Sequence, residues 1–159
     1  AQHVDMVVVL DRSGSMSGAK IQDARRALLD LVGRLSGQDR LALISYSTGV
    51  RTHFDLRPVN NDNRPLMDSA VRQLAAGGST NLGAGLRAGI RMIERAERNG
   101  KLAKLILISD GLANSGVVGP NALGRMAAEA VRNEFSVSTV GVGDEFNEFL
   151  MTTIAERGT

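Results

Sequence analysis

The 159-residue chain contains no cysteine and no tryptophan, and one tyrosine and four phenylalanines are its only aromatic residues. Without cysteine, disulfide bonds and thiolate metal sites are excluded, so stability must come from the hydrophobic core, and the redox compartment stays open. The scarce aromatics and a net charge of +2 without a basic block argue against nucleic-acid binding. No apolar run approaches the roughly 20 residues that a membrane-spanning helix needs, so we expect no direct membrane contact by this chain.

Length and composition fit one globular domain. Hydrophobic residues make up 43% of the chain and charged residues 23%, and a chain of this size can bury most of the surface that it exposes when unfolded. We therefore predict a single domain over residues 1–159. Because the sequence stops directly after an expected helix, we expect a piece of a longer protein that lacks its last strand. An extracellular, periplasmic or membrane-anchored parent is favoured over a cytoplasmic one.

Two patterns alternate along the chain: short runs of Val, Ile and Leu, and longer stretches with apolar residues three or four apart. This alternation predicts an α/β fold, a doubly wound and mostly parallel sheet with helices on both faces. The expected strands are residues 6–10, 41–46, 52–56, 105–108 and 137–142. The expected helices lie within residues 21–35, 66–74, 82–93, 123–131 and 146–154. The second and third strands are too close in sequence for a crossover helix, so they should form a hairpin with one antiparallel edge strand.

Side chains with hard oxygen donors follow the first expected strand. Asp11, Ser13 and Ser15 come directly after it, Thr80 lies in a glycine-rich loop, and Asp110 follows a later strand. In open parallel sheets, ligands bind beyond the carboxyl ends of the strands, where the strand order reverses. Hard divalent cations such as Mg²⁺ prefer oxygen ligands. The pattern therefore predicts one cation site.

The combination of Asp-x-Ser-x-Ser, a distant threonine and Ser-Asp-Gly after a strand resembles the signature of von Willebrand factor A domains. The similarity extends over nearly the whole chain: residues 16–20 resemble the opening of the family's first helix, and residues 39–54 resemble the strand pair of bacterial and inter-alpha-inhibitor-like members. The resemblance implies a metal-ion-dependent adhesion site for Mg²⁺, Mn²⁺ or Ca²⁺. Its residues would be Asp11, Ser13, Ser15, Thr80 and Asp110.

The same resemblance implies a protein ligand, with an Asp or Glu of the partner completing the coordination of the metal. If the hydroxyls bind the ion directly and the carboxylates act mostly through water, the ion keeps positive charge and an exchangeable position. The expected rim that a partner meets consists of Met16, Ser17, Gly78, Ser79, Asn81 and Leu112.

Two other interpretations of these residues stay open. An aspartate-dependent phosphotransferase would use Asp11 as nucleophile and Asp110 to bind Mg²⁺. Against it, Ser13 stands where such enzymes usually carry a second carboxylate, so we predict a non-enzymatic domain. Alternatively, the metal serves only as a structural element of a larger assembly.

Other acidic and basic residues have simpler explanations. Asp144, Glu145 and Glu148 could form a second cation site, but acidic residues in the first turn of a helix also stabilise its dipole. His53 is expected in the edge strand and His3 in the leading tail, both away from the site, so we do not expect a Ser-His-Asp triad.

Overall fold

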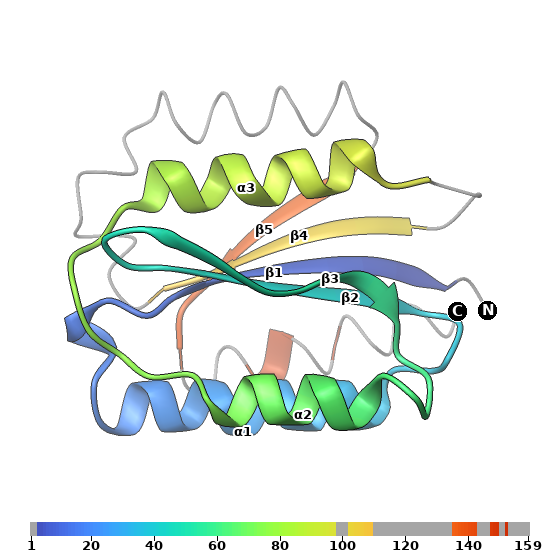
Figure 1. Cartoon of the computed structure of the whole chain (residues 1–159), viewed down its shortest axis with the longest axis horizontal. Coiled ribbons are helices and arrows are strands. Elements are labelled where there is room, and N and C mark those ends of the chain that lie inside the picture. The colour runs from blue at the N-terminus through green and yellow to red at the C-terminus, as the bar shows by residue number, and fades with distance from the viewer. Residues whose placement is uncertain (1–2, 98–101, 110–134, 143–146, 150–151, 153–159) are drawn as a thin grey trace.

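The computed structural model describes residues 3–97, 102–109, 135–142, 147–149 and 152. Its centre is a five-stranded sheet in the order β3-β2-β1-β4-β5 (Figure 1). All neighbouring strands are parallel except β2 and β3, which form the antiparallel hairpin. The predicted α/β fold with one antiparallel edge strand is thereby confirmed. The strands are β1 (Val4–Asp11), β2 (Arg40–Tyr46), β3 (Val50–Pro58), β4 (Leu102–Ile108) and β5 (Ser136–Val140).

Helices cover both faces of the sheet. The helices α1 and α2 lie side by side on one face, and α3 covers the other (Figure 1). Their bounds are Ala19–Arg34 for α1, Arg64–Arg72 for α2 and Leu82–Arg95 for α3, and a short 3₁₀ turn, η1, spans Gly14–Met16. Of the two further expected helices, residues 123–131 lie outside the described residues, and only residues 147–149 and 152 of the second are described, as helical. In the described ranges no helix has the length and apolar character needed to cross a bilayer.

β1 forms the middle of the core because both of its faces are covered. Met6, Val8 and Leu10 pack with α1 and α2, whereas Val7 and Val9 pack with α3. All eight residues of β1 are buried, which explains why this strand is apolar almost throughout rather than alternating. Asp11 is the exception at its carboxyl end, and its burial requires polar partners.

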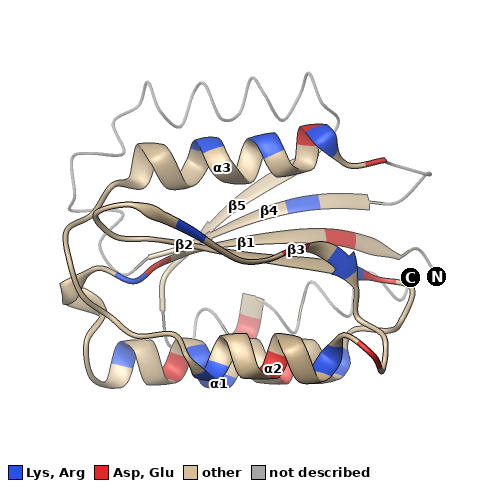
Figure 2. Cartoon of the chain, in the orientation of Figure 1, with Lys and Arg blue, Asp and Glu red and all other residues tan. Residues whose placement is uncertain are grey.

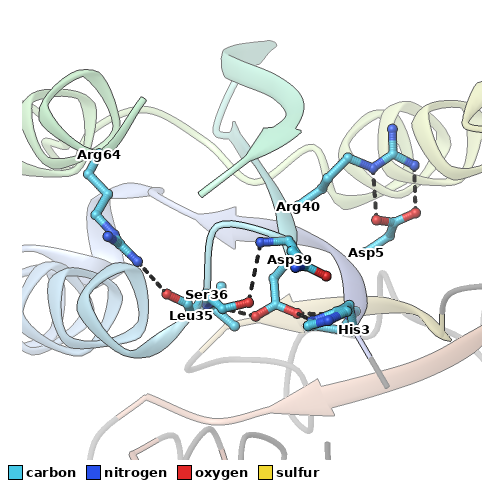
Figure 3. Close-up of polar contacts among 9 residues, drawn as sticks. His3, Asp5, Leu35, Ser36, Asp39, Arg40 and Arg64 are labelled. Carbon is cyan, nitrogen blue, oxygen red and sulfur yellow. Dashed lines mark hydrogen bonds and ion pairs between the residues drawn. The ribbon is translucent and has the colours of Figure 1, made fainter. Parts of the chain in front are cut away.

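The amino ends of β1 and β2 are fixed by buried charges. The Asp39 carboxylate, 0% exposed, accepts hydrogen bonds from the backbone N–H groups of Val4 at 2.9 Å and Ser36 at 2.8 Å (Figure 3). Asp5 receives two hydrogen bonds from the Arg40 guanidinium, at 2.8 and 2.6 Å. These charges have partners and lie at the end of the sheet opposite Asp11, so we assign them a structural role.

The pairing of β3 with β2 shifts register at two places, between Leu41 and Leu43 and between Leu43 and Ile44. At the second place Leu43 pairs with Phe54 and Ile44 pairs with Thr52, so His53 is an extra residue in the edge strand. The strand extends to Pro58, two residues beyond the predicted end, whereas β5 ends at Val140, two residues before it.

Candidate functional site

The Asp11 carboxylate lies at the carboxyl end of β1, at the point where the strand order reverses. Its neighbours across the sheet are Tyr46 of β2 and the end of β4, where Ile108 pairs with Leu10. The carboxylate is 1% exposed. One oxygen accepts the backbone N–H of Ser13 at 2.8 Å, and the other accepts the Ser109 hydroxyl at 2.7 Å. Asp11 is therefore held in one orientation from two strand ends.

Two serine hydroxyls face each other beside this carboxylate. Ser13 Oγ and Ser15 Oγ are 3.1 Å apart. Neighbouring ligands of an octahedral ion with bonds of about 2.1 Å lie about 3.0 Å apart, so this spacing fits two adjacent coordination positions of Mg²⁺. Ser13 is 2% exposed and Ser15 is exposed, so the pair opens towards the surface.

The turn that carries both serines is anchored by Met16. Its side chain is 0% exposed and belongs to the core between the sheet and α1, and its N–H donates to Ser13 O at 2.9 Å. Gly18 follows with a φ of 81°, a left-handed conformation that favours glycine. The prediction that Met16 belongs to the partner-binding rim is wrong, because this side chain fills the core instead of meeting solvent.

The loop that carries Thr80 lies against this turn. Gly77 N–H donates to Arg12 O at 2.8 Å, and Gly14 N–H donates to Gly78 O at 3.0 Å. Gly78 has a φ of 83°, so the loop depends on glycine at this position. Thr80, two residues further on, is exposed. The structure thus brings the segment bearing Thr80 beside Ser13 and Ser15.

The hairpin between β2 and β3 supports the same loop. Both the N–H and the hydroxyl of Ser79 contact Thr48 Oγ1 at 3.2 Å, and Asn81 N–H donates to Ser47 O at 2.7 Å. The Asn81 side chain also accepts the N–H of Ala84 at 3.2 Å, which caps α3. Ser79 and Asn81 are exposed, but both have a part in fixing the loop.

Four of the residues considered from the sequence lie outside the described residues: Asp110, Leu112, Asp144 and Glu145. Ser17 and Gly78 of the expected rim are exposed. Ser109 is a site residue that was not predicted from the sequence, although its position next to Asp110 at a strand end is a signal.

A chain of hydrogen bonds leads from the site to the edge strand. Arg12 Nε donates to Ser45 Oγ at 3.0 Å, and Ser45 Oγ is 2.6 Å from His53 Nε2. Burial, followed by the charges of Arg51 and Arg12, lowers the pKa of His53 to about 4. His53 is consequently neutral near pH 7, so its Nε2 can accept a hydrogen bond from the Ser45 hydroxyl. The sequence placed His53 away from the site, and the structure places it behind Arg12 rather than beside Asp11.

In the part of the site that the structure describes, the available donors are hydroxyls and one carboxylate. Among the described residues, no group of three or more His, Cys, Asp or Glu side chains could hold a metal ion. Hard oxygen donors suit Mg²⁺, Mn²⁺ and Ca²⁺ better than zinc, which favours nitrogen and sulfur. The donor set therefore fits the cations that the sequence predicted.

Comparison with known proteins gives consistent relatives. The family model described as von Willebrand factor type A domain matches residues 5–159. Inter-alpha-trypsin inhibitor heavy chain H3 of Mesocricetus auratus is 33% identical over 157 residues, which are 95% of this chain and 18% of that protein. The chain thus spans less than a fifth of the length of this curated relative.

Solved structures share the fold. A von Willebrand factor type A protein from Catenulispora acidiphila matches with a TM-score of 0.74 and 24% identity, covering 99% of this chain and 37% of that one. The manganese-loaded TRAP protein of Plasmodium vivax matches with a TM-score of 0.71 and 21% identity, covering 98% and 63% of the two chains. At these identities the likeness establishes the architecture alone.

Proposed function

The chain belongs to the von Willebrand factor type A family, and from this premise we propose that it is a divalent-cation-dependent protein-binding domain whose metal site accepts an acidic residue of a partner. The observation that carries the proposal is the pair of hydroxyls of Ser13 and Ser15, 3.1 Å apart. They lie next to an Asp11 carboxylate that is buried and already hydrogen-bonded on both oxygens. Such a site supplies oxygen donors but little negative charge.

Five residues would hold the ion. The hydroxyls of Ser13, Ser15 and Thr80 are the direct ligands in this proposal, and Asp11 and Asp110 act mostly through water. The bound cation would supply positive charge and a coordination position that an incoming Asp or Glu can occupy. Because neutral hydroxyls do not cancel the charge of the ion, attraction to a partner's carboxylate stays strong.

The ion is Mg²⁺, Mn²⁺ or Ca²⁺ in this proposal. Support comes from the hard donors and from the shared fold of a TRAP protein that was solved with manganese. Sites with few charged ligands bind Ca²⁺ weakly, with dissociation constants of about 10⁻⁴ to 10⁻³ M in extracellular modules. A parent protein that is extracellular, periplasmic or membrane-anchored would meet such concentrations.

We propose a non-catalytic role for Asp11. As the nucleophile of a phosphotransferase it would need an accessible oxygen, whereas the carboxylate is 1% exposed and accepts a hydrogen bond on each oxygen. The partner is instead met by exposed positions around the hydroxyl pair. With Met16 removed, this rim consists of Ser17, Gly78, Ser79, Asn81 and Leu112.

Water proton relaxation of bound Mn²⁺ tests the proposed carboxylate acceptor. We expect that N-acetylglutamate α-amide lowers the relaxation enhancement of the Mn²⁺-loaded chain saturably, because its side-chain carboxylate displaces a coordinated water. N-acetylglutamine α-amide, which has a side chain of the same shape and carries no carboxylate, should have a much smaller effect. Equal effects of the two compounds, or none from either, would contradict the proposal.

A further inference from the structure

A groove of about 430 Å³ lies between β3 and α2, on the face of the sheet that α1 and α2 cover. Its volume is within the range of about 300 to 1,000 Å³ that is usual for ligand-binding pockets. Its lining includes Arg51, His53, Phe54 and Arg57 of β3 and Leu66 of α2. None of them belongs to the proposed metal site.

β3 offers an edge to which another strand can be added. It pairs with β2 on one side, and no strand in the described part of the chain pairs with its other side. With nine residues, Val50–Pro58 is long for an edge strand. Unpaired backbone N–H and C=O groups of such an edge can bind an extended peptide.

Arginines stand near both ends of this edge, as the basic positions on β3 in Figure 2 show. Arg51 is exposed and forms no ion pair with any residue that the structure describes. Arg57 donates twice to Asp55 Oδ1, at 2.9 and 2.6 Å, which leaves three of its five N–H donors available. Arg51 can therefore receive a carboxylate directly, whereas Arg57 offers further N–H donors while its charge is partly offset by the ion pair with Asp55.

The spacing of the two arginines favours a peptide over a small anion. Arg51 pairs with Ser45 and Arg57 with Leu41, which are four residues apart on β2, so at about 3.3 Å per residue the two positions are about 13 Å apart along the sheet. A single small anion does not reach both positions, whereas an extended segment of about five residues does. The ligand that uses the whole groove is a strand with acidic residues near both ends.

Between the arginines, two large apolar side chains line the groove together with polar ones. Phe54 is 4% exposed and forms part of the floor, and Leu66, at 46% exposed, is an exposed large hydrophobic residue of α2. His53 adds no charge near pH 7, because burial, Arg51 and Arg12 lower its pKa to about 4. An apolar side chain between two acidic ones would match this arrangement.

We propose that the groove between β3 and α2 binds an extended acidic segment of a partner protein, which adds as a strand to the edge of β3. Its carboxylates pair with Arg51 and Arg57, and an apolar side chain packs on Phe54 and Leu66. The site needs no metal ion, so it is independent of the function proposed above. It gives the chain a second contact surface.

A fluorescein-labelled decapeptide of alternating glutamate and valine is a suitable probe, with the lysine-valine decapeptide as its charge-reversed counterpart. Fluorescence polarisation is measured with the 159-residue chain in EDTA. We expect saturable binding of the glutamate peptide only. Arg51→Glu should weaken it about tenfold or more, because it replaces a charge-assisted contact by repulsion. Arg26→Glu, the same charge change on an exposed arginine of α1, should leave it within about twofold.

Several results would overturn the proposal. Absence of saturable binding, or equal loss in Arg51→Glu and Arg26→Glu, would show that the groove has no specific role. Binding of the peptide in the presence of Mg²⁺ but not in EDTA would assign the peptide to the metal site. Competition by succinate at low millimolar concentration would indicate a small-anion site, and a dimer in sedimentation that Arg51→Glu dissolves would indicate a contact between two copies of the chain.

Discussion

Gly85 of α3 provides a test of how closely this helix packs on the sheet behind the site. A Cβ atom at this position would lie 2.6 Å from Cδ1, 2.9 Å from Cγ and 3.1 Å from Cβ of Tyr46. Tyr46 is 1% exposed, so its ring can make room only by displacing other core atoms. Gly83, two residues earlier in the same helix, has nothing within 4 Å of the same added atom. The two glycines therefore form a matched pair.

The expected magnitudes follow from these distances. Overpacking a core costs about 1 to 3 kcal/mol, whereas Ala in place of Gly stabilises a helix by about 0.5 to 1 kcal/mol. Gly85→Ala should therefore lower the free energy of unfolding by about 1 to 2 kcal/mol, or Tm by about 3 to 6 °C for a chain of this length. Gly83→Ala should raise the free energy of unfolding by up to about 0.5 kcal/mol, since only the helix preference changes.

Urea unfolding followed by far-UV circular dichroism measures both variants against the natural chain. Equal m-values are needed so that the midpoints report stability alone. A Gly85→Ala variant as stable as Gly83→Ala would refute the close approach of α3 to β2. The displaced Tyr46 should also affect the site, because its carbonyl accepts the N–H of Arg12 at 2.9 Å.

Two further predictions concern polar groups near the site. Ser109→Ala should lower the free energy of unfolding by about 1.5 to 3 kcal/mol, because it removes a hydrogen bond to the buried Asp11 carboxylate. Ser109→Thr keeps a hydroxyl and should retain most of this stability. Equal urea midpoints for the two variants would contradict the prediction. The pKa of His53 is about 4 in the fold and 6.5 ordinarily, so the unfolded chain takes up this proton first, and stability should fall as pH drops from 6.5 to 4. His53→Gln should flatten that part of the curve of stability against pH, and an unchanged slope would show that another group is responsible.

The sequence predicted the architecture because its strongest patterns are local. An apolar strand that ends in Asp11 and the short connection between β2 and β3 determine a central parallel strand and a hairpin. The hairpin pairing and the predicted helices 21–35, 66–74 and 82–93 agree with the structure within a few residues. The ends of β3 and β5 differ from the prediction by two residues each, since strands at the side of a sheet have weaker hydrophobic patterns.

The contacts between distant segments could not be read from the sequence. Ser109 and Asp11 are 98 residues apart, and the contact of Thr48 with Ser79 depends on how the hairpin meets another loop. Met16 stands beside a polar motif, so its neighbours indicated a surface position, but the turn directs its side chain into the core. The bulge at His53 likewise arises only from the pairing of two strands.

Calorimetric titration with Mg²⁺ and Mn²⁺ tests the central claim most directly. The natural chain is compared with Asp11→Ala and Thr80→Ala, and with Asp30→Ala as a control, because Asp30 is an exposed carboxylate of α1 paired with Arg34. We expect saturable binding at one site, lost in the first two variants and retained in the control. Absence of binding at millimolar metal, or equal binding by all four proteins, would contradict a cation site formed by these residues.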